Sequence, residues 1–320
     1  MKKLWILVLS AGLAFTPGAH GQTLPATIKV LLPFPPGGLS DTIGRLVSEG
    51  LRTQLKRTVV PENRPGANGA VAVNILKQSD PDGGTLLIVS SGMITFSPHF
   101  EKTLSYDPSR DLTPVVSVAY ADMALVVANN VPASSLREFI ALARSSAIPL
   151  AMGSAGTGNS THAYIELLKD SAKVNFLHVP YKGTSPALID VMAGRVAGMF
   201  IGLSTALPAA KAGKVKILAV VGGRRSSFAP EIRTLTEQGF PGVEILPWFG
   251  LMAPRGISPE TKDALATAVT RAFDTDEMKA RLISAGDTRW VLSGQEFQKM
   301  IQTESDTWRK LVMEKNMSDQ

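Results

Sequence analysis

Short runs of apolar residues alternate with longer amphipathic stretches along most of the chain. The runs at residues 28–34, 59–62 and 86–90 have the length and β-branched content of buried strands. Between the first two, Ile43, Leu46, Val47 and Leu51 recur on one helical face, which predicts a helix from about Ser40. A second helix is expected from about residue 69. This alternation predicts an α/β fold with mainly parallel sheets.

The same alternation recurs between residues 121 and 221, with strand candidates at residues 124–128, 150–153, 175–180, 197–201 and 217–221. Beyond residue 223 the pattern changes to a long loop region and then to amphipathic helices, which need a sheet to cover. We therefore expect the C-terminal part to return to the first unit. The prediction is a discontinuous domain 1 (22–118 plus 222–320), a continuous domain 2 (119–221), and a hinged clamshell with a doubly wound sheet in each lobe.

Residues 1–21 have the three parts of a secretory signal peptide. Lys2 and Lys3 precede an apolar run at residues 5–15, and the small residues Ala19 and Gly21 follow it. That run is shorter than the roughly 18 residues of a membrane-spanning helix, and no cysteine is present to carry a lipid. The sequence therefore predicts a periplasmic protein, exported through a signal peptide that is cleaved near Gln22.

The composition narrows the classes of partner. The chain has a formal charge of +6 and only 6% aromatic residues, and no run of basic residues is longer than a pair such as Arg224–Arg225. A nucleic-acid-binding surface is therefore not expected, whereas a modest positive charge suits an anionic small ligand. Without cysteine there are no disulfides or thiolate metal sites, and the histidines lack metal-ligand spacing, so neither a metal nor a cofactor is expected.

Two glycine-rich turns lie between a predicted strand and a predicted helix, at residues 33–41 (PFPPGGLSD) and 153–162 (GSAGTGNSTH). Glycine lets the backbone approach a ligand closely, and the unpaired N–H groups at the following helix starts can hold an anion. Neither turn matches the G-x-G-x-x-G or P-loop pattern, so nucleotide binding is disfavoured. Because each predicted domain contributes one such turn, we expect an anion site in the crevice between them.

An enzymatic alternative is a secreted hydrolase or isomerase that uses His162 or Asp41. Its support is weak, because the chain has no G-x-S-x-G elbow and no acidic partner that the sequence assigns to Ser154 or Ser160. Asp41 is the residue type of a helix N-terminus, and a cap is its more ordinary role.

The ordered succession of these motifs resembles the Bug-type extracytoplasmic solute receptors of tripartite tricarboxylate transporters. Besides the two glycine-rich turns, the resemblance rests on residues 62–67 (ENRPGA), 82–87 (DGGTLL), 106–108 (YDP), 178–183 (HVPYKG), 186–190 (PALID), 206–208 (ALP) and 248–251 (WFGL). The resemblance implies a periplasmic binding protein fold with two lobes that close on a carboxylate. It also implies a receptor that is not an enzyme and passes its ligand to membrane components of the transporter. We expect a monomer, because a receptor that delivers its ligand singly can act as one.

In this family the ligand carboxylate is held by main-chain N–H groups and ordered water at the two glycine-rich loops. The candidate ligand-binding residues are therefore those of the loops and of the neighbouring cleft: Phe34, Pro36, Gly37, Gly38, Ser40, Ser91, Gly92, Ser154, Ala155, Gly156, Thr157, Gly158, Ser160, His162, Lys182 and Ile201. A receptor that delivers its ligand to a membrane sensor, rather than to a transporter, would have the same site.

One departure from the family bears on the ligand. Relatives commonly carry an acidic residue and an asparagine where this chain has Ile201 and Gly202. Without the acidic group a ligand ammonium would be buried unpaired, at a cost of several kcal/mol. The departure favours an aromatic or dicarboxylic ligand without an amine, with Ile201 offering it apolar surface.

Overall fold

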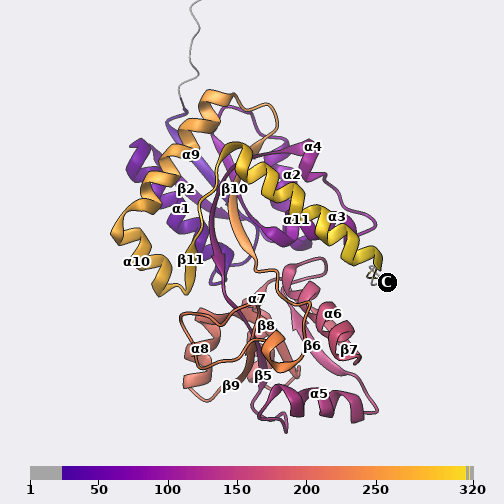
Figure 1. Cartoon of the computed structure of the whole chain (residues 1–320). Coiled ribbons are helices and arrows are strands. Elements are labelled where there is room, and N and C mark those ends of the chain that lie inside the picture. Colours follow the sequence, from indigo (N-terminus) through magenta and orange to yellow (C-terminus); the bar gives the residue numbers. More distant parts are fainter. Residues whose placement is uncertain (1–23, 315–316, 318–320) are drawn as a thin grey trace, which may run out of the picture.

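A computed structural model describes residues 24–314 and 317 of the chain. The predicted signal peptide, residues 1–21, lies outside the described residues. Figure 1 shows two lobes, each an α/β sheet flanked by helices, and this confirms the clamshell fold with a doubly wound sheet in each lobe. Over the described ranges, no helix combines the length and the apolar character needed to cross a membrane.

The first lobe is built on a six-stranded sheet. Its strands follow the order β11 (Asp287–Arg289), β4 (Leu112–Ala121), β10 (Trp248–Pro254), β3 (Thr85–Ser90), β1 (Thr27–Leu32) and β2 (Thr58–Asn63). The accompanying helices are α1 (Leu39–Leu55), α2 (Ala70–Lys77), α9 (Pro259–Asp274), α10 (Asp276–Ser284) and α11 (Gly294–Glu314). Shorter turns are η1 (Ala67–Gly69), η2 (Gly92–Phe96), α3 (Ser97–Phe100) and α4 (Pro108–Asp111).

The second lobe is built on a five-stranded sheet. Its strands follow the order β7 (Phe176–Pro180), β6 (Leu150–Ser154), β8 (Gly198–Gly202), β5 (Met123–Ala128) and β9 (Val215–Val220). Its helices are α5 (Leu136–Ser145), α6 (Ser160–Ala172), α7 (Thr184–Met192) and α8 (Leu203–Lys211), and the short turn η3 (Thr236–Gln238) follows β9.

The expectation of mainly parallel sheets is wrong, because both sheets are mixed. The pairs β1–β2, β1–β3, β6–β7 and β6–β8 are parallel, as the alternating pattern predicts. In contrast, β10 runs antiparallel to β3 and β4, and β5 runs antiparallel to β8 and β9. A single residue, Asp122, joins β4 to β5, so β5 enters the second sheet without the crossover helix that parallel neighbours require.

The chain passes between the lobes twice, at Asp122 and again before β10. Residues 222–246 follow β9 and stay attached to the second lobe: Leu235 N–H donates to Val220 O (3.0 Å), and the Tyr164 hydroxyl donates to Ile245 O (2.6 Å). The predicted domain limits place this segment in domain 1, and they place the end of β4 in domain 2. The domain limits themselves stay a prediction. The hydrogen bonds of residues 222–246 and the pairing of β4 within the six-stranded sheet attach these two segments to the other lobe.

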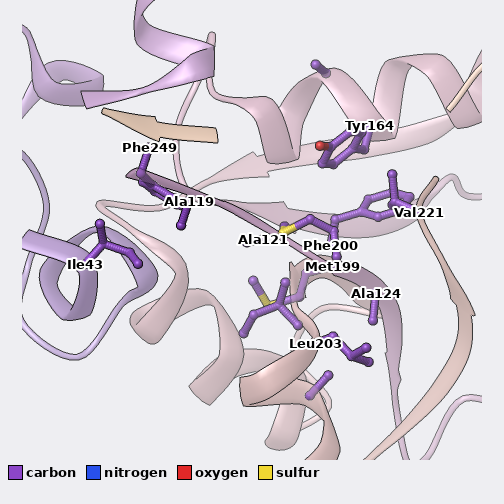
Figure 2. Close-up of a cluster of buried hydrophobic side chains, with 14 of the residues drawn as sticks. Ile43, Ala119, Ala121, Ala124, Tyr164, Met199, Phe200, Leu203, Val221 and Phe249 are labelled. Carbon is purple, nitrogen blue, oxygen red and sulfur yellow. The ribbon is translucent and has the colours of Figure 1, made fainter. Parts of the chain in front are cut away.

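Buried side chains continue from one lobe into the other along the crossing strands. Figure 2 shows Ile43, Ala119 and Phe249 of the first lobe in the same cluster as Tyr164 and Phe200 of the second. Apolar burial is the main favourable term in folding, so this continuous core ties the hinge into both lobes.

Asp287 is the exception within this buried region. It lies opposite Ala121 in the β4–β11 pair, its exposed fraction is 0%, and neither carboxyl oxygen has a hydrogen-bond partner among the described residues. Burial, with the nearby charge of Asp122, raises the pKa of Asp287 to about 8. The Asp122 carboxylate itself accepts a short hydrogen bond from Ser226. Asp287 is therefore protonated at neutral pH in the folded protein.

A carboxyl group with a raised pKa makes the folded protein less stable as pH rises. The unfolded chain releases this proton near pH 3.8 and the folded protein near pH 8, so the contribution of Asp287 is fully present at low pH and is lost as pH rises through about 8. Between pH 5 and pH 8, Asp287 should lower the free energy of unfolding by up to about 1.36 kcal/mol for each pH unit. We predict that this slope disappears in Asp287→Asn. Urea unfolding at several pH values measures this slope. The exposed Asp263→Asn serves as control, and a slope unchanged by Asp287→Asn would contradict the assignment.

Candidate functional site

A cavity lies between the two lobes, and we call it the interlobe cavity. The first lobe lines it with the end of β3, the start of α1 and the start of β10, and the second lobe lines it with the starts of β5, α6 and α7. Its lining residues are Phe34, Pro35, Gly38, Leu39, Ser40, Ser90, Met123, Ala155, Asn159, Ser160, Thr161, Gly183, Thr184, Ser185, Pro186, Pro247 and Phe249.

Three helices begin at this cavity. Gly38 precedes α1 and Gly183 precedes α7, and neither glycine supplies a side chain to cap the first turn. Asn159 precedes α6, and its Oδ1 accepts the N–H of Thr161 (3.0 Å). The first N–H groups of a helix lack an intrahelical acceptor and carry a partial positive charge, so the cavity is surrounded by donors that suit an anion.

The starts of α1 and α7 face each other from opposite lobes. A Cβ atom on Gly38 would lie 3.3 Å from Oγ1 of Thr184, and one on Gly37 would lie 3.7 Å from Oγ of Ser185. Two helix N-termini at this separation repel each other unless a negative charge lies between them. The geometry therefore couples the presence of an anion to the approach of the lobes.

Two serine hydroxyls of the first lobe also indicate that the cavity binds a ligand. Ser40 and Ser90 both line the cavity, both are buried, and neither Oγ has a hydrogen-bond partner among the described residues. The Thr161 hydroxyl differs, because it accepts the N–H of Ala155 (2.8 Å) and donates to Asn159 (3.1 Å). A buried hydroxyl without a partner is unfavourable, so Ser40 and Ser90 are available to bond a ligand.

The remaining wall is apolar, and the cavity lining contains no Asp, Glu, His, Lys or Arg side chain. Phe34, Leu39, Met123 and Phe249 supply most of this surface. Charge in a ligand is thus met here by main-chain donors and hydroxyls, whereas its body meets apolar side chains. The lining also offers no carboxylate, imidazole or amine that could act as a general base toward its serine hydroxyls.

Of the predicted binding residues, five line the interlobe cavity: Phe34, Gly38, Ser40, Ala155 and Ser160. Pro36 and Gly37 lie on the exposed part of the same loop. Ser91 and Gly92 lie behind the cavity against the start of α6: the Ser91 Oγ is 3.4 Å from the Ser160 Oγ, and a Cβ on Gly92 would lie 2.6 Å from Ser160 N. Ser91 and Gly92 therefore contribute to the contact between the lobes.

Gly156, Thr157 and Lys182 line a second space, which we call the outer chamber. It shares Phe34 and Ala155 with the interlobe cavity, so the two adjoin. The residues that line it are Phe34, Gly66, Ala67, Asn68, Glu101, Ala155, Gly156, Thr157, Pro180, Tyr181 and Lys182. Gly158 packs against Glu101 beside this chamber.

Ser154 and His162 support the second glycine-rich loop from behind. The buried Ser154 Oγ accepts the N–H of Gly156 (3.1 Å) and lies 2.6 Å from Nε2 of His178. His162 accepts the N–H of Gly158 (3.3 Å) and stacks on the His178 ring at 3.6 Å. Burial is the main cause, and the neighbouring His162 the second, that lowers the pKa of His178 to about 3, so the His178 ring is neutral. Neither Ser154 nor His162 lines the interlobe cavity, so the hydrolase alternative loses its candidate histidine there.

Asp41 holds the first loop in place. Its carboxylate accepts the N–H of Gly37 (3.1 Å), the side-chain amide of Asn63 (2.9 Å) and Nε of Arg45 (3.1 Å). Burial alone would raise the pKa of Asp41, but these hydrogen bonds together lower it below its usual value. A carboxylate bonded in this way is a poor proton acceptor, so its role is structural.

Ile201 does not lie where the sequence analysis expected it. It pairs with Ala124 in the centre of the second sheet, its exposed fraction is 2%, and it is not among the residues that line the interlobe cavity. The next residue, Gly202, is the one that approaches the first lobe, because a Cβ on it would collide with Leu39. Ile201 packs in the core instead.

Sequence reasoning missed part of the site, above all the start of α7. Thr184 and Ser185 follow Gly183, and a Ser/Thr pair after glycine is a usable signal for a helix start. Phe249 belongs to the sequence motif at residues 248–251 (WFGL) but is not among the predicted binding residues. Its neighbour Trp248 turns away from the interlobe cavity, and its indole N–H donates to Glu304 (2.9 Å).

Comparison with known proteins gives the family. The profile described as "Tripartite tricarboxylate transporter family receptor" matches residues 43–317. Protein BugT of Bordetella pertussis is 29% identical over 313 residues, covering 97% of this chain and 95% of BugT.

Two solved structures are similar to the whole fold. One is described as R. palustris Rpa4515 with adipate; it has 30% identity and a TM-score of 0.87 and covers 91% of this chain and 97% of its own. The other, MatC (Rpa3494) from Rhodopseudomonas palustris with bound malate, has 31% identity and a TM-score of 0.82 and covers 89% and 98%.

These findings agree with a cavity that offers main-chain donors and no catalytic side chain. The chain belongs to the receptor family of tripartite tricarboxylate transporters, as a Bug-type periplasmic solute receptor rather than an enzyme.

Proposed function

We propose that this protein binds a small carboxylate in the interlobe cavity and delivers it to the membrane components of a tripartite tricarboxylate transporter. The observation that carries the proposal is the meeting of the α1 and α7 starts across a cavity whose lining has no charged side chain. A carboxylate between them accepts N–H groups from both lobes. The relatives with adipate and malate support a carboxylate as the ligand class.

The apolar wall indicates what the rest of the ligand is like. Phe34, Leu39, Met123 and Phe249 would contribute about 25 cal/mol for each Å² of apolar ligand surface that they cover. An ammonium group would find no carboxylate in this lining. The proposed ligand is therefore a carboxylate with an apolar body. We further propose that the receptor is a periplasmic monomer.

The lobes already touch around the cavity, so this structure represents the closed form. The Ser97 hydroxyl of the first lobe donates to Gly158 O of the second (2.8 Å), and Asn159 Nδ2 donates to Asn68 Oδ1 (3.3 Å). These contacts form only when the lobes meet, and the ligand favours that state because it contacts both.

We predict that ligand binding closes the protein. A thermal-shift screen of mono-, di-, tri- and aromatic carboxylates identifies a ligand, which should add about 2.7 kcal/mol of stability at 100 times its dissociation constant. Small-angle scattering should then show a smaller radius of gyration with that ligand than without it. No stabilisation by any carboxylate, or an identical radius in both states, would count against the proposal.

We also predict that Ser40→Ala and Ser90→Ala weaken binding without destabilising the ligand-free protein. A hydrogen bond to a charged group contributes about 1.5–3 kcal/mol, so each variant should lose about 10- to 100-fold in affinity by calorimetry. Stability of the free protein should hold or rise, because an unpaired buried hydroxyl is removed. Ser48→Ala is the control, since that hydroxyl donates to Gly44 O (2.7 Å) on the same helix. Unchanged affinity in both variants would show that neither hydroxyl meets the ligand.

A further inference from the structure

Gly202 is a glycine that its own backbone does not require. It ends β8 and lies directly before α8, with φ −53° and ψ 133°, a conformation open to every residue type. Gly183, which lies before α7 in the same lobe, is different, because its φ of 127° favours glycine. The reason for a glycine at residue 202 therefore lies in what surrounds the missing side chain.

That space is filled by Leu39 of the first lobe. A Cβ atom on Gly202 would lie 2.7 Å from Cδ1 of Leu39 and 3.1 Å from both its Cδ2 and its Cγ. Carbon atoms that are not bonded to each other pack best at about 3.5–4.0 Å, so a side chain at residue 202 and Leu39 in its present position exclude each other. Leu39 therefore reaches across the cleft into the second lobe when the lobes are closed.

Leu39 is also part of the apolar wall of the interlobe cavity, whereas Gly202 is not among the lining residues. Met123, another residue of that wall, is the partner of Gly202 in the antiparallel β5–β8 pair. Gly202 thus lies directly behind the wall, where residues from the two lobes meet. On its other side, the Leu39 side chain borders the space that a ligand would occupy.

The backbone at Gly202 has no room to retreat from an added side chain. The flanking Ile201 and Leu203 are both buried, and Leu203 belongs to the core cluster that Figure 2 shows. The Leu203 N–H also donates to Asp122 O (2.8 Å) at the crossing between the lobes. The end of the Leu39 side chain, in contrast, is free to rotate. A side chain at residue 202 would therefore displace Leu39, and the adjoining free space is the interlobe cavity.

We propose that the missing side chain at Gly202 sets the width of the interlobe cavity, because it lets Leu39 withdraw from the ligand space and so admits a carboxylate whose apolar body is a ring. This inference rests on the proposed function and adds the shape of the ligand's body. Gly202 is then a positioning residue, which acts on specificity through Leu39 without touching the ligand.

The test compares heptanoate with cyclohexanecarboxylate, which have the same number of carbon atoms and one carboxylate each but differ in width. The wild type should bind cyclohexanecarboxylate at least as tightly as heptanoate, because the ring has fewer bonds to immobilise. In Gly202→Ala, the displaced Leu39 should weaken cyclohexanecarboxylate about tenfold, as overpacking of a fitted site does, while heptanoate stays within about threefold. Calorimetry measures all four affinities.

A double-mutant cycle identifies Leu39 as the mediator. In a Leu39→Ala background there is no leucine side chain to displace, so adding Gly202→Ala should change the affinity for cyclohexanecarboxylate by less than about twofold. Gly223→Ala is the matched control: Gly223 is an exposed glycine in the segment attached to the second lobe, and a Cβ atom on it would meet no atom within 4 Å. Both affinities should be unchanged in this control.

An equal effect of Gly202→Ala on both ligands, or the same loss in the Leu39→Ala background, would overturn this inference and leave the carboxylate receptor intact. Failure of cyclohexanecarboxylate to bind the wild type, while any other carboxylate binds, would also overturn it. An unfolded Gly202→Ala protein would do the same, since the inference requires that Leu39 can move into the cavity. Failure of every carboxylate to bind would instead overturn the proposed function itself.

Discussion

Anion binding and closure of the lobes both depend on two helix N-termini, those of α1 and α7, which face each other across the cleft. Each helix end carries roughly half a positive charge, and Thr184 and Ser185 lie within 4 Å of where side chains at Gly38 and Gly37 would begin. Like charges this close oppose closure. An anion between them reverses the sign of the interaction, so the charge that is recognised is also the charge that favours the closed state. Recognition and conformational change thus share one electrostatic cause.

Because helix N-termini supply the positive charge, the site needs no charged side chain to bind an anion. Main-chain donors are held by the helices, so they lose no side-chain entropy on binding, unlike a lysine or arginine. The charged residue closest to the α1 start, Asp41, would oppose an anion, but Arg45 pairs with it and Asn63 and Gly37 bond to it. Its carboxylate is committed to shaping the loop. The site therefore reads charge through backbone and leaves its walls free for other contacts.

The parallel strands and both glycine-rich turns could be predicted from local sequence patterns, because strands and turns depend on residues close together in the chain. The antiparallel pairing of β10 and the attachment of residues 222–246 depend on contacts distant in sequence, and periodicity does not report them. Ile201 shows the limit most directly. Successive residues of a strand point to opposite faces, so an error of one position separates a core residue from the cleft, where Gly202 meets Leu39.

The division between backbone and wall has a consequence for how ligand choice can change. Substitution scarcely alters a main-chain N–H, and the glycines that bring it close tolerate few replacements, since Gly156 and Gly183 have φ values of 141° and 127°. Affinity for a carboxylate is therefore difficult to remove by single substitutions among the apolar residues of the walls. Discrimination between carboxylates then rests on the side chains of the apolar wall, such as Leu39, Met123 and Phe249 in the interlobe cavity. Receptors built in this way can change ligands while keeping the interaction that closes them.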